Sequence, residues 1–228
     1  DLTTDYDLNI SAGDVEVDQL TDIVVNVPVD AEGIVVIDIN GTNYTATISN
    51  GKAVFNNQTN LGAGRYNITA YFGDGKYANK TAVGAYNIIK HNSTVEIAVA
   101  SILVGDTAYI NVTAPSDNVT IEINGKSYSK VKYENGVAYF EVTGLAYGNK
   151  TVVAIYGGSN KYVANSTTEN FTVSKRSSEI DVIAVGNAVG NNVTISVNVT
   201  DTATGYVVVN VNGTNYTINL TGSRGSVD

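Results

Sequence analysis

The chain has 228 residues, of which 43% are hydrophobic and 15% are charged, a composition that suits about one to three compact domains and excludes a disordered polyelectrolyte. Cysteine, methionine and tryptophan are absent, which excludes disulfides, thiolate metal sites and cysteine nucleophiles. No apolar run approaches the roughly 18 residues that span a bilayer, so we expect no membrane insertion in this segment. The chain does not begin with methionine, which indicates a processed product or an excised piece.

The net charge of −9 is unevenly placed along the chain. Ten of the 22 acidic residues and none of the 13 basic residues precede Lys52, and such a field repels nucleic acid and anionic lipid. This segment contains an acidic run of Asp14, Glu16, Asp18 and Asp22. Alternation puts the first three on one side of a strand, with no glycine-containing loop to make them converge, which favours a solvated face. Calcium binding stays open as the alternative.

A strand-and-turn motif recurs three times. Alternating apolar residues lead into an Asn-Gly pair and then a tyrosine in Ile34–Tyr44, Asn118–Tyr128 and Tyr206–Tyr216. The alternation predicts half-buried strands, and Asn-Gly supplies the positive φ of a two-residue hairpin turn. The strands on either side of each turn are therefore antiparallel. The turn glycines are spaced by 84 and 88 residues, at Gly41, Gly125 and Gly213.

A second repeated block sets the limits of the modules. Tyr71–Thr81 reads YFGDGKYANKT, and Ile155–Thr167 reads IYGGSNKYVANST. Lys90 and Lys175 lie 85 residues apart, and each is followed at once by a new alternating segment. Because no Gly-, Ser- or Pro-rich tract lies there, we expect junctions without a flexible linker. The predicted units, called modules 1, 2 and 3, are residues 1–90, 91–175 and 176–228.

The only histidine, His91, falls at the first junction. Without a second imidazole or a thiol, it can complete neither a transition-metal site nor a Ser-His-Asp triad. We expect a solvated linker side chain. The sequence offers no other credible acid–base or nucleophile pair, so it predicts no enzyme, no catalytic residue, no metal site and no cofactor.

Module 3 is shorter than the other two. Gly125 lies 50 residues before Lys175, but Gly213 lies only 15 before Asp228, so about 35 residues of the repeat are missing. They correspond to Gly136–Lys175. The apolar stripe that would then lack a second-sheet partner consists of Val207, Val209, Val211 and Tyr216. We expect such a stripe to cause association. Either the chain is a window cut from a longer repeat array, or a neighbouring molecule donates the missing strands.

About seven short strands in about 85 residues, with turn signals every 8 to 12 residues, predict an all-β fold of tandem immunoglobulin-like (Ig-like) sandwiches without cysteine. The chain has 15 tyrosines against four phenylalanines. Because Tyr44, Tyr128 and Tyr216 recur at matching inward positions, we expect most tyrosines to lie in the core rather than on a sugar- or protein-binding surface.

The order of these motifs resembles that of a known family. A Val/Ile strand, NGxxY, a second Asn-Gly, Y-x-G-D/G followed by K-Y-x-x-x-x-T, and a Val-x-Lys junction are similar to the Ig-like repeats of adhesin-like surface proteins of methanogenic archaea and to related bacterial repeats. The resemblance covers nearly the whole chain and is weakest at Asp1–Tyr6. It implies a non-enzymatic stalk or adhesive fibre of an extracellular, cell-surface protein.

The resemblance also bears on partners. It implies adjoining repeats of a longer chain, other copies of the protein, or another cell's surface. Two alternatives stay open, namely a subunit of an extracellular filament assembled by strand donation and a ligand- or carbohydrate-binding adhesin module.

Asparagine followed two places on by serine or threonine is the most frequent chemical signal. The chain has 17 such sequons, whereas 28 Asn and 40 Ser plus Thr placed at random would give about five. Strand composition is one explanation, and N-glycosylation outside the membrane is the other, which we favour. The candidate glycosylation sites are Asn9, Asn40, Asn43, Asn57, Asn67, Asn79, Asn92, Asn111, Asn118, Asn149, Asn165, Asn170, Asn192, Asn198, Asn212, Asn215 and Asn219.

Overall fold

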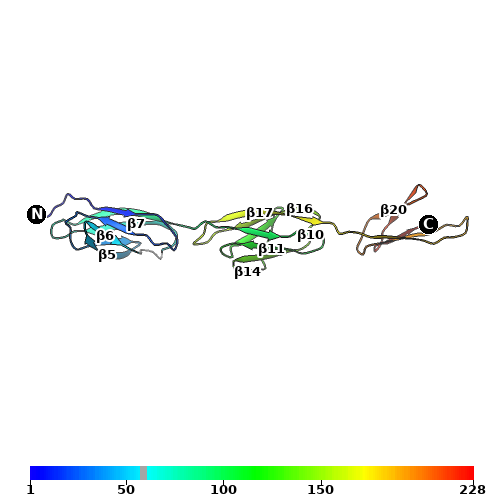
Figure 1. The fold of residues 1–228 in the computed structure, drawn as a ribbon, viewed down its shortest axis with the longest axis horizontal. Coiled ribbons are helices and arrows are strands. Elements are labelled where there is room, and N and C mark those ends of the chain that lie inside the picture. Colours follow the sequence, from blue (N-terminus) through cyan, green and yellow to red (C-terminus); the bar gives the residue numbers. More distant parts are fainter. Residues whose placement is uncertain (57–60) are drawn as a thin grey trace.

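The computed structural model describes residues 1–56 and 61–228 as three β-rich units that follow one another along a single axis (Figure 1). Within these ranges the chain forms strands and no helix, and the strands make tandem Ig-like sandwiches without cysteine, as expected. No helix in the described part of the chain is long and apolar enough to cross a membrane.

Module 1 contains a complete sandwich. Its strands are β1 (Asn9–Ala12), β2 (Val15–Glu16), β3 (Ile23–Asn26), β4 (Ile34–Ile39), β5 (Thr42–Ser49), β6 (Lys52–Phe55), β7 (Gly64–Phe72) and β8 (Lys80–Ile89). They follow the order β1-β3-β6-β5-β4-β7-β8-β2. Because β5 pairs with both β4 and β6, it joins the two layers of the sandwich.

Module 2 repeats this arrangement with a break in one strand. Its strands are β9 (Glu96–Val99), β10 (Ile102–Leu103), β11 (Ala108–Thr113), β12 (Val119–Ile123), β13 (Lys126–Tyr128), β14 (Lys132–Glu134), β15 (Val137–Val142), β16 (Gly148–Tyr156) and β17 (Asn165–Ser174). The two sheets have the orders β10-β17-β16-β12-β13 and β14-β15-β11-β9. The strand that is continuous as β5 is divided here into β13 and β14, one in each sheet.

The hairpin turns confirm the reading of the Asn-Gly pairs. Each pair has positive φ at both residues, and each joins two antiparallel strands: β4 with β5, β12 with β13, and β20 (Tyr206–Val211) with β21 (Thr214–Asn219). Asparagine and glycine occupy this backbone region at low cost, so the turn chemistry fixes the register of the flanking strands.

Two hydrophobic clusters fill modules 1 and 2. The first cluster runs from Tyr6 to Ile88 and the second from Val95 to Val173. Inward residues such as Ile37 and Ile121 are fully buried, and burial of such a side chain stabilises by about 1.5–3 kcal/mol. Each cluster stays within one predicted module, and the module limits themselves stay a prediction.

A short parallel pairing closes each complete sandwich, which the sequence patterns do not indicate. β2 runs parallel to β8, and β10 runs parallel to β17. The backbone N–H of Val17 then donates to the carbonyl of Ile89 at 2.8 Å, and Val104 donates to Ser174 at 2.8 Å. The first and last parts of each module are thereby fastened to each other.

Module 3 lacks a closed core. It contains β18 (Ile180–Ala184), β19 (Ile195–Val199), β20, β21 and β22 (Arg224–Val227), as a three-stranded sheet β18-β19-β22 and a separate hairpin β20-β21. Val197 and Ile218 are its buried hydrophobic side chains, whereas Val211 and Tyr216 are 42% and 37% exposed.

One detail of the predicted missing segment is wrong. β22 pairs with β19 through Ile195↔Val227, just as β15 pairs with β11 through Ile110↔Phe140. Positions equivalent to the start of β15 are therefore present, because a Gly222-Ser223 turn with positive φ replaces the second Asn-Gly. The strands without a counterpart in module 3 are β16, β17 and the short β10 and β14, of which β14 is replaced by a single bridge between Thr221 and Arg224.

Candidate inter-module junction

Module 2 begins with a backbone bridge at His91. The N–H of His91 donates to the carbonyl of Lys161 at 2.8 Å, and the N–H of Val163 donates to the carbonyl of His91 at 3.0 Å. The imidazole also lies against the Tyr162 ring, with centroids 5.4 Å apart. His91 is thus part of module 2 and not of a linker.

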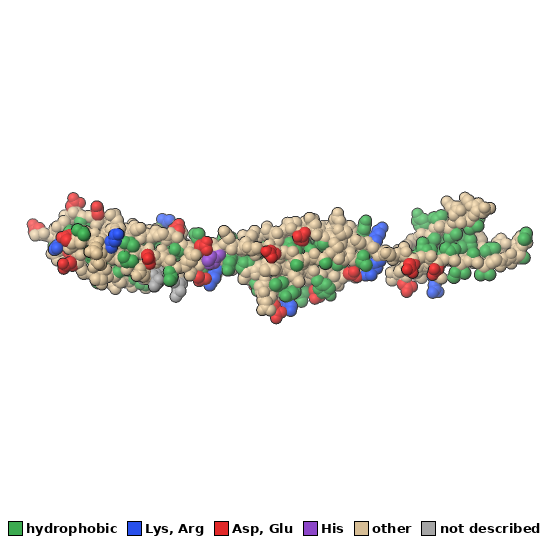
Figure 2. Space-filling view, in the orientation of Figure 1, with side chains coloured by type: hydrophobic (Ala, Val, Ile, Leu, Met, Phe, Trp, Pro, Cys, Tyr) green, Lys and Arg blue, Asp and Glu red, His purple; other side chains and the backbone are tan. Residues whose placement is uncertain are grey.

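Two polar side-chain contacts connect module 1 to module 2. His91 Nδ1 lies 2.7 Å from Glu16 Oε2, and Lys161 Nζ lies 2.8 Å from Asp18 Oδ2. Figure 2 shows the histidine among acidic and basic side chains at the neck between the first two units. The hydrogen bond to Asp18 raises the pKa of Lys161. We call these four residues the junction clasp.

The expectation of a solvated linker histidine is wrong. The His91 side chain is 27% exposed, because the Tyr162 ring and the Glu16 carboxylate flank it. The reason lies in tertiary structure: β2 runs parallel to β8, which carries Glu16 to the end of module 1 that meets module 2. A scan of one sequence detects only local partners, and Glu16 is 75 positions away from His91.

The acidic run does not converge on one point. Asp14 accepts hydrogen bonds from the backbone N–H and the side-chain amide of Asn87, which lower the pKa of Asp14. Glu16 and Asp18 turn toward module 2 instead, and Asp18 lies in a turn with φ 64° rather than in a strand. In the described ranges, no three His, Asp or Glu side chains are grouped as metal ligands.

The second junction has a different set of contacts. Arg176 Nε donates to the carbonyl of Val104 at 3.0 Å, and its guanidinium forms an ion pair with Asp106. Lys175 Nζ lies over the Tyr147 ring, 5.1 Å from its centroid. Because module 3 has no β16–β17 hairpin, it has no counterpart of Lys161 to complete the clasp.

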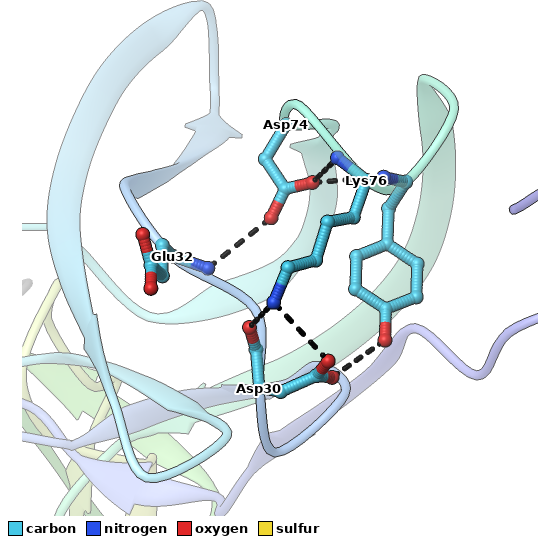
Figure 3. Close-up of polar contacts among 5 residues, drawn as sticks. Asp30, Glu32, Asp74 and Lys76 are labelled. Atoms are coloured by element: carbon cyan, nitrogen blue, oxygen red, sulfur yellow. Dashed lines mark hydrogen bonds and ion pairs between the residues drawn. The ribbon is translucent and has the colours of Figure 1, made fainter. Parts of the chain in front are cut away.

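At the far end of module 1, Asp74, Lys76 and Asp30 belong to a network of hydrogen bonds and one ion pair (Figure 3). Asp74 accepts from the backbone N–H groups of Lys76 and Tyr77, at 2.6 and 2.8 Å, and these bonds help to lower its pKa. The Asp30 carboxylate accepts hydrogen bonds from the Tyr77 hydroxyl at 2.6 Å and from the Lys76 ammonium at 3.3 Å. Both donors lower the pKa of Asp30, and the bond to Asp30 raises the pKa of Tyr77.

The same backbone bridge occurs near the start of modules 1 and 2. The N–H of Thr3 donates to the carbonyl of Lys76, as His91 donates to Lys161. Lys76 thus occupies the position of Lys161, but it pairs with Asp30 of its own module. The lysine next to this backbone bridge is therefore a repeated position, and its ion pair joins two modules at Lys161 but stays within one module at Lys76.

The candidate glycosylation sites lie on the surface. Of the 17 sequon asparagines, Asn57 lies outside the described residues. The remaining ones are exposed, apart from the half-buried Asn198. Neighbouring Ile68 is fully buried while Asn67 points outward, as the alternation predicts. Exposure satisfies a requirement for modification, and occupancy stays a prediction.

The tyrosines divide between core and surface. Tyr6, Tyr86 and Tyr156 are buried, and Tyr44 and Tyr128 pack against the two core clusters as expected. Module 3 differs because its Tyr216 has no core to face. The clearly exposed tyrosines are distributed over all three modules: Tyr71, Tyr109, Tyr147, Tyr206 and Tyr216.

Solved structures with similar folds are tandem or modular β-proteins. A three-immunoglobulin-domain segment of titin is 13% identical, covering 97% of this chain and 86% of that chain, with a TM-score of 0.40. Sidekick-1 immunoglobulin domains 1–5 are 14% identical, covering 99% and 54%, with a TM-score of 0.40. A calcium-stabilised adhesin with which an Antarctic bacterium binds ice is 18% identical, covering 100% and 66%, with a TM-score of 0.35.

No protein-family model and no curated protein matches the chain. Identity and TM-score to the solved structures are both low, so the Ig-like assignment rests on the strand order and register given above.

Proposed function

We propose that this chain is a structural segment of an extracellular, cell-surface protein, in which successive Ig-like modules hold an adhesive or exposed part away from the surface. The observation that carries the proposal is the direct junction between modules 1 and 2. It combines a backbone bridge at His91 with the side-chain hydrogen bond between Glu16 and His91 and the ion pair between Asp18 and Lys161. A chain whose modules abut without free linker residues resists bending, which is the physical requirement of a spacer.

The adhesin-like repeats of methanogenic archaea are the source that the sequence motifs favour. The surface position of the described sequon asparagines supports N-glycosylation as part of this proposal. Glycans on both faces of a rod would keep neighbouring rods apart and hinder proteolysis. The role is non-enzymatic, and the partners are adjoining repeats of the same kind.

Small-angle X-ray scattering tests the spacer role. The intact chain should give the maximum dimension of an extended rod, and a variant with a (Gly-Ser)₄ insert between Lys90 and His91 should give a broader distribution of distances. A compact profile, or an intact chain as flexible as the insert variant, contradicts the proposal.

Intact-mass analysis tests glycosylation. Protein from its source should exceed the polypeptide mass by whole glycans, with modified peptides at exposed sites such as Asn43, Asn67 and Asn215. A bacterially expressed copy is the matched unmodified control and should still fold. A native mass equal to that of the bare polypeptide would contradict glycosylation, and strand composition alone would then explain the excess of sequons.

A further inference from the structure

Module 3 reproduces the main strands of module 2 except for the β16–β17 hairpin. The sheet β18-β19-β22 corresponds to β9-β11-β15, and the hairpin β20-β21 corresponds to β12-β13. In module 2 the other edge of β12 is paired with β16, through Val119↔Tyr156, Ile121↔Ala154 and Ile123↔Val152. In the described chain no strand pairs with that edge of β20. The first open element is therefore a strand edge.

A second open element lies at the turn after β18. In module 2 the N–H of Asp106 donates to the carbonyl of Leu103 at 3.0 Å, across Gly105 with positive φ. Module 3 forms the same turn, because Asn191 donates to Ala188 at 3.0 Å and Gly190 also has positive φ. Val104 beside the first turn binds β17, whereas the equivalent Val189 is fully exposed and has no strand beside it.

The apolar face between these two elements is uncovered. Figure 2 shows hydrophobic side chains gathered on the visible face of the third unit. At the end of module 3 that meets module 2, a hollow of about 840 Å³ is lined by Tyr147 of module 2 together with Ile180, Val199, Tyr206 and Val207 of module 3. In module 2 the corresponding interior is filled by Val152, Ala154 and Tyr156, all of them fully buried. The occupant of module 3 must therefore supply inward side chains in the same alternation.

A single β-hairpin can pair with both the free edge of β20 and the segment Asn187–Val189. The β16–β17 hairpin contacts β12 with its first strand and β10 with its second. In module 2 this hairpin follows β15 through a short connection, residues 143–147, and in module 1 the equivalent hairpin β7–β8 is the next element after β6. Because β22 occupies the β15 position, its end lies where that connection begins. A hairpin joined behind β22 reaches both edges without a crossing.

We propose that β20 and Asn187–Val189 together form an acceptor for a two-stranded antiparallel hairpin of the repeat's own kind, joined directly behind β22. The first strand of the bound hairpin pairs with the free edge of β20, and its second strand runs parallel to Asn187–Val189. The inward side chains of the hairpin then bury Val207 and Val209. The turn of such a hairpin also reaches Val104–Asp106 of module 2, as the turn carrying Lys161 reaches module 1. Acceptor filling thus completes the core of module 3 and the second junction together. This inference is independent of the proposed spacer role.

The test extends the chain after Asp228 by a copy of Val142–Lys175, because Asp228 aligns with Glu141. The control carries the same extension with Val152→Ser, Ala154→Ser and Tyr156→Ser in the copy. Amide hydrogen exchange of β20 should slow by roughly tenfold or more in the extended chain relative to the control. Sedimentation should show the 228-residue chain associating with rising concentration and the extended chain remaining monomeric.

Two outcomes would overturn the proposal. Equal protection of β20 in the extended chain and its control means that no hairpin acceptor exists. Continued association of the extended chain, with β20 protection that rises with its concentration, means that a second molecule and not the attached hairpin fills the edge. If the first extension folds poorly, a copy of Asn56–Lys90 provides a second hairpin of the same repeat, and the same criteria apply to it.

Discussion

Modules 2 and 3 share five main strands, since β9, β11, β12, β13 and β15 correspond to β18, β19, β20, β21 and β22, but only module 2 has a closed core. The turns are equally well formed in both, since Asn124-Gly125 and Asn212-Gly213 each direct an antiparallel hairpin. The difference is the β16–β17 hairpin, which extends the β12 sheet and adds four fully buried side chains to the core, Val152, Ala154, Tyr156 and Val173. The Asn-Gly turns are therefore sufficient to form the hairpins, but a closed core also requires the side chains of the β16–β17 hairpin.

The largest expected effect on stability comes from truncating the equivalent side chain, Ile123 or Val211, to alanine in modules 2 and 3. Ile123 and Val211 each lie two residues before the turn glycine, and they are 2% and 42% exposed. Ile123→Ala should lower the free energy of unfolding of module 2 by about 2–5 kcal/mol, because it leaves a cavity. Val211→Ala should change stability by less than about 0.5 kcal/mol. Denaturant titration monitored by hydrogen exchange separates the modules, and equal losses would contradict the comparison.

A reciprocal exchange at the second turn gives a smaller effect. Gly51 and Ser223 occupy equivalent positions with φ of 74° and 68°. A left-handed conformation costs a non-glycine residue about 1–2 kcal/mol, so Ser223→Gly should protect the β19–β22 amides by up to about 1 kcal/mol. Gly51→Ser should destabilise module 1 by at least that strain, because its Cβ would also lie 3.1 Å from the carbonyl oxygen of Val27. A destabilised Ser223→Gly variant would show that the strain argument fails.

The junction clasp should respond to neutralisation of Lys161 without loss of either core. Lys161→Gln removes the ion pair to Asp18 and should widen the range of angles between modules 1 and 2. Lys76→Gln is the matched control, because its partner Asp30 lies within module 1. Residual dipolar couplings measure the relative orientation. Equal behaviour of the two variants would mean that the ion pair does not orient the modules.

The smallest effect concerns acid pH and compares two equivalent turns. Asp74 accepts the N–H groups of Lys76 and Tyr77, whereas Ser159 accepts those of Lys161 and Tyr162. The pKa of Asp74 is lowered by folding, so its contribution is complete above the ordinary value of 3.8 and is lost as pH falls through the lowered pKa. As pH falls through this range, amide hydrogen exchange at Lys76, corrected for its intrinsic pH dependence, should accelerate. Exchange at Lys161 should not accelerate. Parallel changes at both turns would contradict the assignment.

Most of the fold could be predicted because its signals are local. Alternation placed Ile37 and Ile121 inward, and Asn-Gly located the hairpins. The parallel pairing of β2 with β8 and the contact of His91 with Glu16 could not be predicted, because each joins residues more than 70 positions apart. The strand β22 was missed because Gly222-Ser223 replaces the expected Asn-Gly. The sequence patterns locate the turns and the buried face of each strand. The junction between modules 1 and 2 depends on the parallel pairing of β2 with β8, which the patterns do not reveal.

The parallel pairing of β2 with β8 and of β10 with β17 also determines how the chain would carry tension. A pull on the two ends of a module acts along both paired strands in opposite senses, so their hydrogen bonds, such as Val17 to Ile89, are sheared together. Bonds loaded together fail at higher force than bonds opened one after another. In module 3, Asn187–Val189 has no such partner in the described structure, so no parallel strand pair would share the load there and the antiparallel β19–β22 ladder would carry it instead.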